Sequence, residues 1–268
     1  MIRTAMTLFW LAAISACSTA PMTPKAPPAA VADLAPAGKL RAAINFGNPI
    51  LAAKAAGTGE PAGVSVDLSR ELARRLGVTL ELVTYTAAGR VVQGIRANAW
   101  DVAFVAIDPA RAVDMDYTEP YVVIEGAYLV AQGSPIESNA QVDRKGVRVV
   151  VGAGSAYDLY LSRELKHAQI VRAPTSPAVT DMMVAQSLEV AAGVRQQLEA
   201  DAKRIPGVRL LDGRFMVINQ AMATPKGRAA GARYLAEFIE EMKATGFIAN
   251  ALTRYGITGA GVAPPAAR

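Results

Sequence analysis

The sequence predicts an α/β protein of two lobes, each a mostly parallel sheet flanked by helices, with two crossover strands joining the lobes. A pattern of strand, helix, strand, helix and strand occurs twice along the chain, which favours two parallel sheets with covering helices. Two extended apolar segments without a helix of their own, 126–131 and 216–221, follow the two repeats and suit a hinge. With 268 residues, 52% of them hydrophobic, the chain can bury two modest cores.

The first repeat opens with the apolar run 40–46, which leads into Gly47 and suits a buried strand running into a loop. The next element is predicted as an amphipathic helix, because apolar residues recur every four positions and a glycine follows them: Val64, Leu68, Leu72, Leu76 and Gly77. The repeat continues with a strand over 78–83, a helix over 90–97 and a strand over 100–107.

The second repeat has strands over 147–152, 169–173 and 188–194, separated by helices over 156–166 and 177–186. A helix over 195–204 and a strand over 215–223 follow. Thr224 is then expected to cap a long helix with Pro225 at its first position, and Gly246 to end it.

These elements divide the folded part of the chain into two lobes. Residues 39–127 and 220–258 are assigned to the first lobe, because the closing helices of 225–255 are expected to return to it. Residues 128–219 form the second lobe. In such a fold the binding cleft lies at the carboxyl ends of the strands, where loops and helix N-termini converge.

The N-terminal segment is typical of an export signal. Arg3 precedes an apolar run over 5–16, which is too short to span a bilayer, and small residues follow it. Ile14, Ser15, Ala16 and Cys17 resemble the bacterial lipobox, in which the cysteine is lipidated, so 1–16 is predicted as a lipoprotein signal peptide. The alternative is an ordinary signal peptide that is cut after Ala20 and removes Cys17, the only cysteine.

Two further segments are predicted to lie outside the lobes. Residues 17–38 alternate Pro and Ala with few other residue types, which indicates a tether that cannot bury enough surface to become ordered. Residues 259–268 have a similar composition and are predicted to be a disordered tail.

Composition argues against several classes of function. The net charge is +5, but Lys and Arg are scattered along the chain, which favours a solvated basic surface over a nucleic-acid interface. His167 is the only histidine and lies in the hydrophilic end of a predicted helix, so no Ser/His/Asp triad is expected. A metal site with several histidine ligands cannot form from one histidine. A phosphate-binding GxxxxGK motif is also missing. We therefore expect no catalytic residue, metal or cofactor.

Five motifs occur in an order that resembles the family 3 bacterial extracellular solute-binding proteins, the periplasmic receptors of polar amino-acid ABC transporters. They cover residues 38–257, and the resemblance implies the type II two-lobed periplasmic-binding-protein fold. The motifs begin at Gly63, at Trp100, at Arg111 with the run from Asp116 to Tyr121, at Gly126 and at Val151.

The resemblance implies a set of ligand-binding residues. Arg111 stands where the family has an arginine for the ligand carboxylate, and its planar guanidinium suits that task; the alternative is a surface bridge to Asp114 or Asp116. Ser155 and Ala156 begin a helix whose free amides favour an anion, although Ser155 can also be only a helix cap. Two aromatic residues are placed beside the ligand or, alternatively, in the core: Phe46 and Tyr157.

Departures from the family pattern limit the expected ligand. Family members that bind amino acids carry an Asp for the α-ammonium where this chain has Val194. An unpaired ammonium in a closed cleft costs about 1–3 kcal/mol. Asp108 or Glu125 is a candidate substitute, and Arg195 suggests a second anionic group on the ligand. We therefore expect a small carboxylate with an unusually placed amine or none.

The predicted function is capture of a small anionic ligand for an ABC permease by a monomeric periplasmic protein that a lipid anchor holds at a membrane. Ser18 after Cys17 is compatible with sorting to the outer membrane. One alternative is a cleft enzyme of the same fold, similar to cyclohexadienyl dehydratase, with Glu125 or Asp108 as acid or base. The other is a sensory or structural lipoprotein that acts alone.

Overall fold

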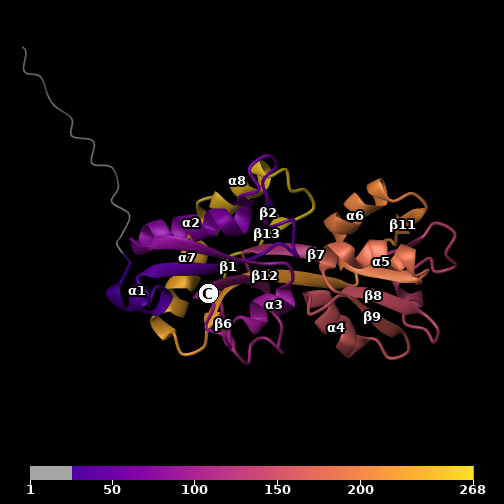
Figure 1. Cartoon of the computed structure of the whole chain (residues 1–268), viewed down its shortest axis with the longest axis horizontal. Coiled ribbons are helices and arrows are strands. Elements are labelled where there is room, and N and C mark those ends of the chain that lie inside the picture. The colour runs from indigo at the N-terminus through magenta and orange to yellow at the C-terminus, as the bar shows by residue number, and fades with distance from the viewer. Residues whose placement is uncertain (1–25, 268) are drawn as a thin grey trace, which may run out of the picture.

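The computed structural model describes residues 26–267 and shows two lobes side by side (Figure 1). Two strands of ten residues each, β7 (Val122–Ala131) and β12 (Met216–Pro225), run from one lobe into the other and contain the two predicted crossovers. The predicted signal peptide and Cys17 lie outside the described residues. No helix within 26–267 combines the length and the apolar character needed to cross a bilayer.

Each lobe has the predicted alternation of strands and helices. The first lobe contains β1 (Lys39–Asn45), α2 (Val64–Leu76), β4 (Thr79–Tyr85), α3 (Ala88–Gln93), β5 (Val102–Ala106), α7 (Ala229–Ala244) and α8 (Phe247–Arg254). The second contains β8 (Arg148–Gly152), α4 (Ala156–Glu164), β9 (Gln169–Ala173), α5 (Val179–Ala185), β10 (Val190–Val194) and α6 (Arg195–Arg204). Shorter elements are β2 (Ala53–Lys54), β3 (Pro61–Ala62), β6 (Met115–Tyr117), η1 (Asn139–Gln141), η2 (Ser176–Ala178) and β11 (Val208–Leu210).

The strands of both lobes belong to one hydrogen-bonded sheet, in the order β4-β1-β5-β12-β7-β10-β8-β9, rather than to two separate sheets as expected. The cause is the length of the crossover strands. One part of β12 pairs with β5 over 220–223, another part pairs with β7 over 216–220, and β7 pairs with β10 over 126–130. These pairings are antiparallel, whereas β1 is parallel to β4 and β5, and β8 is parallel to β9 and β10.

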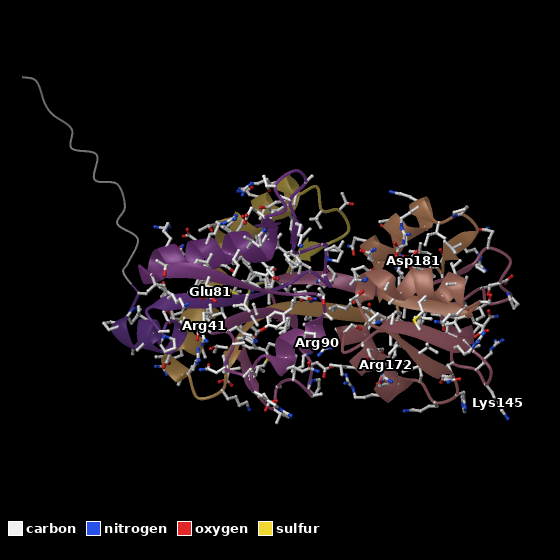
Figure 2. The ribbon with its side chains drawn as sticks, viewed as in Figure 1. Arg41, Glu81, Arg90, Lys145, Arg172 and Asp181 are labelled. Atoms are coloured by element: carbon white, nitrogen blue, oxygen red, sulfur yellow. The ribbon has the colours of Figure 1, made fainter. Side chains whose placement is uncertain are left out.

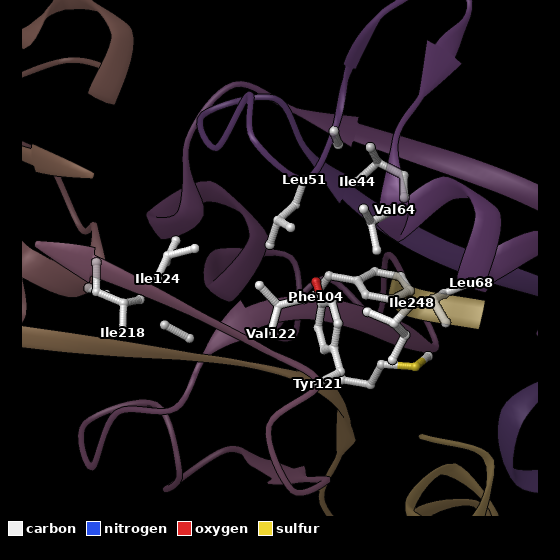
Figure 3. Close-up of a cluster of buried hydrophobic side chains, with 14 of the residues drawn as sticks. Ile44, Leu51, Val64, Leu68, Phe104, Tyr121, Val122, Ile124, Ile218 and Ile248 are labelled. Atoms are coloured by element: carbon white, nitrogen blue, oxygen red, sulfur yellow. The ribbon is translucent and has the colours of Figure 1, made fainter. Parts of the chain in front are cut away.

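Buried apolar side chains connect the sheet to its helices in both lobes. In the first lobe, Phe104 of β5 and Tyr121 meet edge to face, with ring centroids 6.1 Å apart, and Figure 3 shows them among the aliphatic side chains of β1, α2 and α8. In the second lobe, Leu129 of β7, Val150 of β8 and Met183 of α5 belong to another buried cluster. The hinge strands therefore contribute to the packing on both sides of the cleft.

The tether prediction for residues 17–38 is wrong in its C-terminal part, because Pro28–Leu34 forms helix α1. Leu34 is fully buried, and Gly231 of α7 lets it approach so closely that a Cβ on Gly231 would lie 2.8 Å from a Leu34 methyl carbon. Asp33 accepts a 2.9 Å hydrogen bond from the Gly231 amide. Pro28 at the first helical position favours a helix start, and the apolar Leu34 supplies an anchor despite the Ala/Pro composition.

The tail and the start of α7 also differ from the predictions. Residues 261–262 form β13 (Gly261–Val262), which pairs with β7, and Ala263 is buried, so the prediction of a disordered tail is wrong over 261–263. Backbone pairing of this kind leaves no signature in side-chain composition. Pro225 ends β12 instead of opening a helix, Thr224 donates its hydroxyl to the Asp101 carbonyl, and α7 starts only at Ala229.

Candidate functional site

A small cavity lies between the lobes at the carboxyl ends of β1, β5 and β8. The first lobe and hinge line it with Asn45, Gly47, Asn48, Ala88, Val105, Ala106, Arg111, Ile218 and Gln220. The second lobe lines it with Ser155, Ala156, Tyr157, Ser176 and Val194. Its volume of about 30 Å³ is enough for only a few water molecules, so the cleft is closed.

Arg111 is the charged group of the cavity. It follows β5 in a turn that the Asp108 carbonyl closes by accepting the Arg111 amide, 3.0 Å away. Its side chain is buried and donates to the carbonyls of Ala106, in the first lobe, at 2.9 Å and of Gly154, in the second, at 2.8 Å. The predicted alternative, a surface bridge to Asp114 or Asp116, is therefore wrong.

The Arg111 charge has no carboxylate partner within 26–267, and its Nε is buried without a hydrogen bond. Burial lowers the pKa of the Arg111 guanidinium from its ordinary value, although Tyr117 and Asp108 oppose that change. Because a guanidinium still keeps its proton in proteins, the cavity carries one buried and unneutralised positive charge. Such a charge can bind a small anion.

The second-lobe wall is the N-terminus of α4. Ser155 is the N-cap and accepts a 3.0 Å hydrogen bond from the Asp158 amide, and Asp158 in turn accepts from the Gly154 amide at 2.8 Å. Arg172 of β9, labelled in Figure 2, donates through Nε to Asp158 and holds this carboxylate in place. Ser155 thus has its capping role, and the amides of Ala156 and Tyr157 have no partner in the described chain.

Two neutral polar groups of the cavity are also buried. Burial raises the pKa of the Tyr157 hydroxyl, which the Ser155 and Ser176 side chains approach. Asn48, in the loop after β1, has a buried Oδ1 without a donor among residues 26–267. Unsatisfied buried polar atoms are uncommon in native proteins, and the presence of two of them at one cavity, Arg111 Nε and Asn48 Oδ1, favours a polar ligand.

The lobes touch directly around the cavity. Gly154, with φ +68°, lies so close to Gly89 of α3 that a Cβ on Gly154 would stand 2.8 Å from the Gly89 Cα. Asp108 and Arg163 form a salt bridge across the cleft at 2.9 Å. Together with the bond from Arg111 to the Gly154 carbonyl, these contacts describe a closed conformation.

Comparison with known proteins decides the family. The family model for bacterial extracellular solute-binding proteins, family 3, matches residues 40–258. The chain belongs to this family. Curated protein sequences gave no match.

The solved structures most similar to this family 3 solute-binding protein include three receptors with two lobes. A mutant of ArgBP from T. maritima has a TM-score of 0.74 at 18% identity, with 85% of this chain and 100% of that chain covered. The solute receptor for L-cysteine of Neisseria gonorrhoeae has a TM-score of 0.73 at 22% identity, covering 84% and 92%. The ancestral amino acid-binding protein AncCDT-1, a precursor of cyclohexadienyl dehydratase, has a TM-score of 0.71 at 20% identity, covering 84% and 98%. At these identities the likeness shows the type II fold.

Four of the residues expected at the site of this family 3 protein line the cavity: Arg111, Ser155, Ala156 and Tyr157. Asp108 and Phe46 do not. The Asp108 carboxylate is paired with Arg163, and the half-buried Phe46 ring packs beside the core with the Lys54 ammonium 6.0 Å from its centroid. The sequence places both next to the cleft but does not tell which way each side chain points.

Glu125 and Arg195 also lie away from the cavity, because they neutralise one another at the hinge. The Glu125 carboxylate accepts hydrogen bonds from Arg214 at 2.7 Å and from Arg195 at 2.9 Å, and these two bonds lower the pKa of Glu125. Arg195 is thus a hinge residue in this structure and does not supply the cavity with a second positive charge. No group of three or more His, Cys, Asp or Glu side chains able to hold a metal occurs among residues 26–267.

Four polar residues of the cavity were not predicted from the sequence: Asn45, Asn48, Ser176 and Gln220. Asn48 belongs to a loop at a strand end, and Ser176 opens the short helical turn before α5. Polar residues are common in such loops, so their type alone carries no signal. Gln220 lies within the apolar hinge strand β12 and is buried, which is the one feature that the sequence could have flagged.

Proposed function

We propose that this family 3 protein captures a small carboxylate-bearing ligand between its lobes and presents it to an ABC importer. The observation that carries the proposal is Arg111, a buried guanidinium without a carboxylate partner in the described chain, between the two lobes and opposite the N-terminus of α4. A carboxylate placed there gains charge-assisted hydrogen bonds from the guanidinium and from helix amides. Two structural neighbours support the same class of function: ArgBP from T. maritima and the solute receptor for L-cysteine of Neisseria gonorrhoeae.

In the proposed function, the receptor needs no step other than opening and closing of its two lobes. Arg111 is buried and the lobes touch around the cavity, at Gly89 with Gly154 and at Asp108 with Arg163, so entry of a ligand requires the lobes to separate. The hinge strands β7 and β12 are the segments that link them, and a ligand that touches both lobes shifts the population toward the closed state. The permease then recognises the closed receptor.

Binding, rather than catalysis, is also favoured by the position of the acids. A dehydratase on this scaffold would need a carboxylate at the ligand, and the two candidates, Asp108 and Glu125, are each paired with arginine outside the cavity. The comparison protein AncCDT-1 is itself described as an amino acid-binding protein.

The test is a titration of the full chain with a panel of small carboxylic acids and amino acids, screened by thermal shift and measured by calorimetry. Arg111→Ala should weaken binding of any hit by about 100-fold or more, because it removes a charge-assisted pair. Arg204→Ala removes an exposed arginine bound to Asp181 in the second lobe and is the matched control. A hit that binds Arg111→Ala as tightly as the wild type would contradict the proposal.

We further propose that Cys17 is lipidated and holds the exported receptor at a periplasmic membrane surface. The proposal is supported by the lipobox-like residues before Cys17 and by membership of an extracellular family. Cys17→Ala should move the protein from the membrane fraction to the soluble fraction and abolish its labelling by a palmitate analogue. Unchanged fractionation and labelling would refute lipidation.

A further inference from the structure

The charge balance of the cavity differs from that of a site for a zwitterion. Arg111 supplies one positive charge, and no Asp or Glu of residues 26–267 lines the cavity. The three nearby acids are engaged: Asp108 binds Arg163, Glu125 binds Arg195 and Arg214, and Asp158 binds Arg172. An ammonium brought into this space would lie near a like charge and lose its water without gaining a carboxylate.

The unsatisfied polar atoms specify what else the ligand must offer. The buried Arg111 Nε is a donor and needs an acceptor, which a carboxylate provides. The buried Oδ1 of Asn48 is an acceptor and needs a donor, which a carboxylate lacks. A neutral hydroxyl group on the ligand supplies the missing donor without adding positive charge.

The contacts between the lobes restrict the ligand further. The cavity is bounded by the small side chains of Ala88, Ala106 and Ala156, and the lobes already meet where Gly89 faces Gly154. A long ligand would have to hold these contacts apart.

We propose that the ligand is a small hydroxycarboxylate without an ammonium group, whose carboxylate binds Arg111 and whose hydroxyl donates to Asn48. This inference rests on the proposed function and narrows it to one chemical class. It also gives a role to Asn48, which sequence reasoning did not single out.

Matched ligands test the class directly. Calorimetric titrations of the full chain compare three hydroxy acids with the amino acids in which an ammonium replaces the hydroxyl: glycolate with glycine, lactate with alanine, and glycerate with serine. A fourth comparison, of glycolate with acetate, removes the hydroxyl alone. Each hydroxy acid should bind about tenfold or more tightly than its partners. Tighter binding of the amino acids, or equal binding of acetate, would overturn the inference and leave carboxylate capture intact. Failure of every member of the panel to bind would also overturn it, and the Arg111→Ala comparison on the wider panel would then decide the proposed function separately.

A substitution designed to reverse the preference for hydroxy acids over amino acids gives a second test. Val194 lines the cavity and is the N-cap of α6, a position that accepts Asp or Asn. Val194→Asp should bring a carboxylate into the site and shift the preference by about tenfold or more toward the amino acid of each pair. Val194→Asn has the same shape and capping ability without the charge, and should keep the preference for hydroxy acids. An unchanged preference in Val194→Asp, with both variants folded by thermal melting, would contradict the charge argument.

Asn48→Ala tests the contribution of the ligand hydroxyl to binding. It should make glycolate and acetate bind alike, since the acceptor for the hydroxyl is gone, while Arg111 still binds the carboxylate of both. A retained preference for glycolate in this variant would show that Asn48 does not recognise the hydroxyl.

Discussion

The carboxylate of Asp108, after β5 in the first lobe, lies 2.9 Å from the guanidinium of Arg163, in α4 of the second lobe. Asp108 is buried, whereas Arg163 is 44% exposed along its side chain, so the pair sits at the rim of the cleft. Together with the bond from Arg111 to the Gly154 carbonyl, it joins the lobes through protein groups alone. The closed conformation of this receptor thus has stabilising contacts of its own, to which a ligand adds.

Breaking this rim pair should shift the receptor toward the open form. Because partly exposed ion pairs contribute about 0.2–1 kcal/mol, Arg163→Ala is expected to change the ratio of open to closed molecules by about 1.4- to fivefold. Small-angle X-ray scattering of the full chain should show a larger radius of gyration without ligand. Arg148→Ala, which removes a pair with Glu189 inside the second lobe, is the control and should leave it unchanged. An equal radius in Arg163→Ala and wild type would contradict a role in closure.

A side chain at Gly154 should obstruct closure. Its φ of +68° is unfavourable for alanine by about 1–2 kcal/mol, and its Cβ would stand 2.8 Å from the Gly89 Cα of the other lobe. Gly77 has the same φ of +68°, and no atom lies within 4 Å of a Cβ placed on it. Gly77→Ala therefore introduces the same backbone strain as Gly154→Ala without the contact between the lobes. Both variants should lose similar thermal stability, but only Gly154→Ala should weaken ligand binding. Equal binding by the two variants would show that the lobes need not meet at Gly154.

Helix α1 should stabilise the first lobe. Leu34 is fully buried against α7, so Leu34→Ala is expected to lower the free energy of unfolding by about 2–5 kcal/mol in urea denaturation. Ala32→Ser, at an exposed position of the same helix, should have an effect below about 0.5 kcal/mol. Similar unfolding midpoints for Leu34→Ala and wild type would indicate that residues 28–34 do not dock.

The predicted elements that hold are those with a strong local pattern. The four-residue spacing from Val64 to Leu76 and the glycine after it gave α2 its correct bounds, and strand 169–173 is β9 without change. Predictions failed where a contact with a residue far away in the sequence determines the secondary structure. Pro225 ends a strand because β12 pairs with β6 there, and Pro28–Leu34 is a helix whose Leu34 packs against Gly231 of α7.

The same division holds at the site. Arg111 and Ser155 were expected from the resemblance to the family, which places an arginine and a helix N-terminus at the ligand, and both line the cavity. Asn48 was not expected, since an asparagine in a loop becomes notable only when its oxygen is buried without a donor. Glu125 and Arg195 each suggested a ligand contact in isolation, and only their 2.9 Å pairing showed that they satisfy one another.

Most of the strands and helices, the two lobes and the family could be predicted from the sequence, because they follow from apolar periodicity and motifs that are local along the chain. Which charges are left without a partner became clear from the three-dimensional structure. Asp108 and Arg163 are 55 residues apart and Glu125 and Arg195 are 70 apart, yet each pair neutralises itself, while Arg111 keeps its charge for a ligand. Charge pairing depends on distances in space, and the spacing of residues along a chain does not record them.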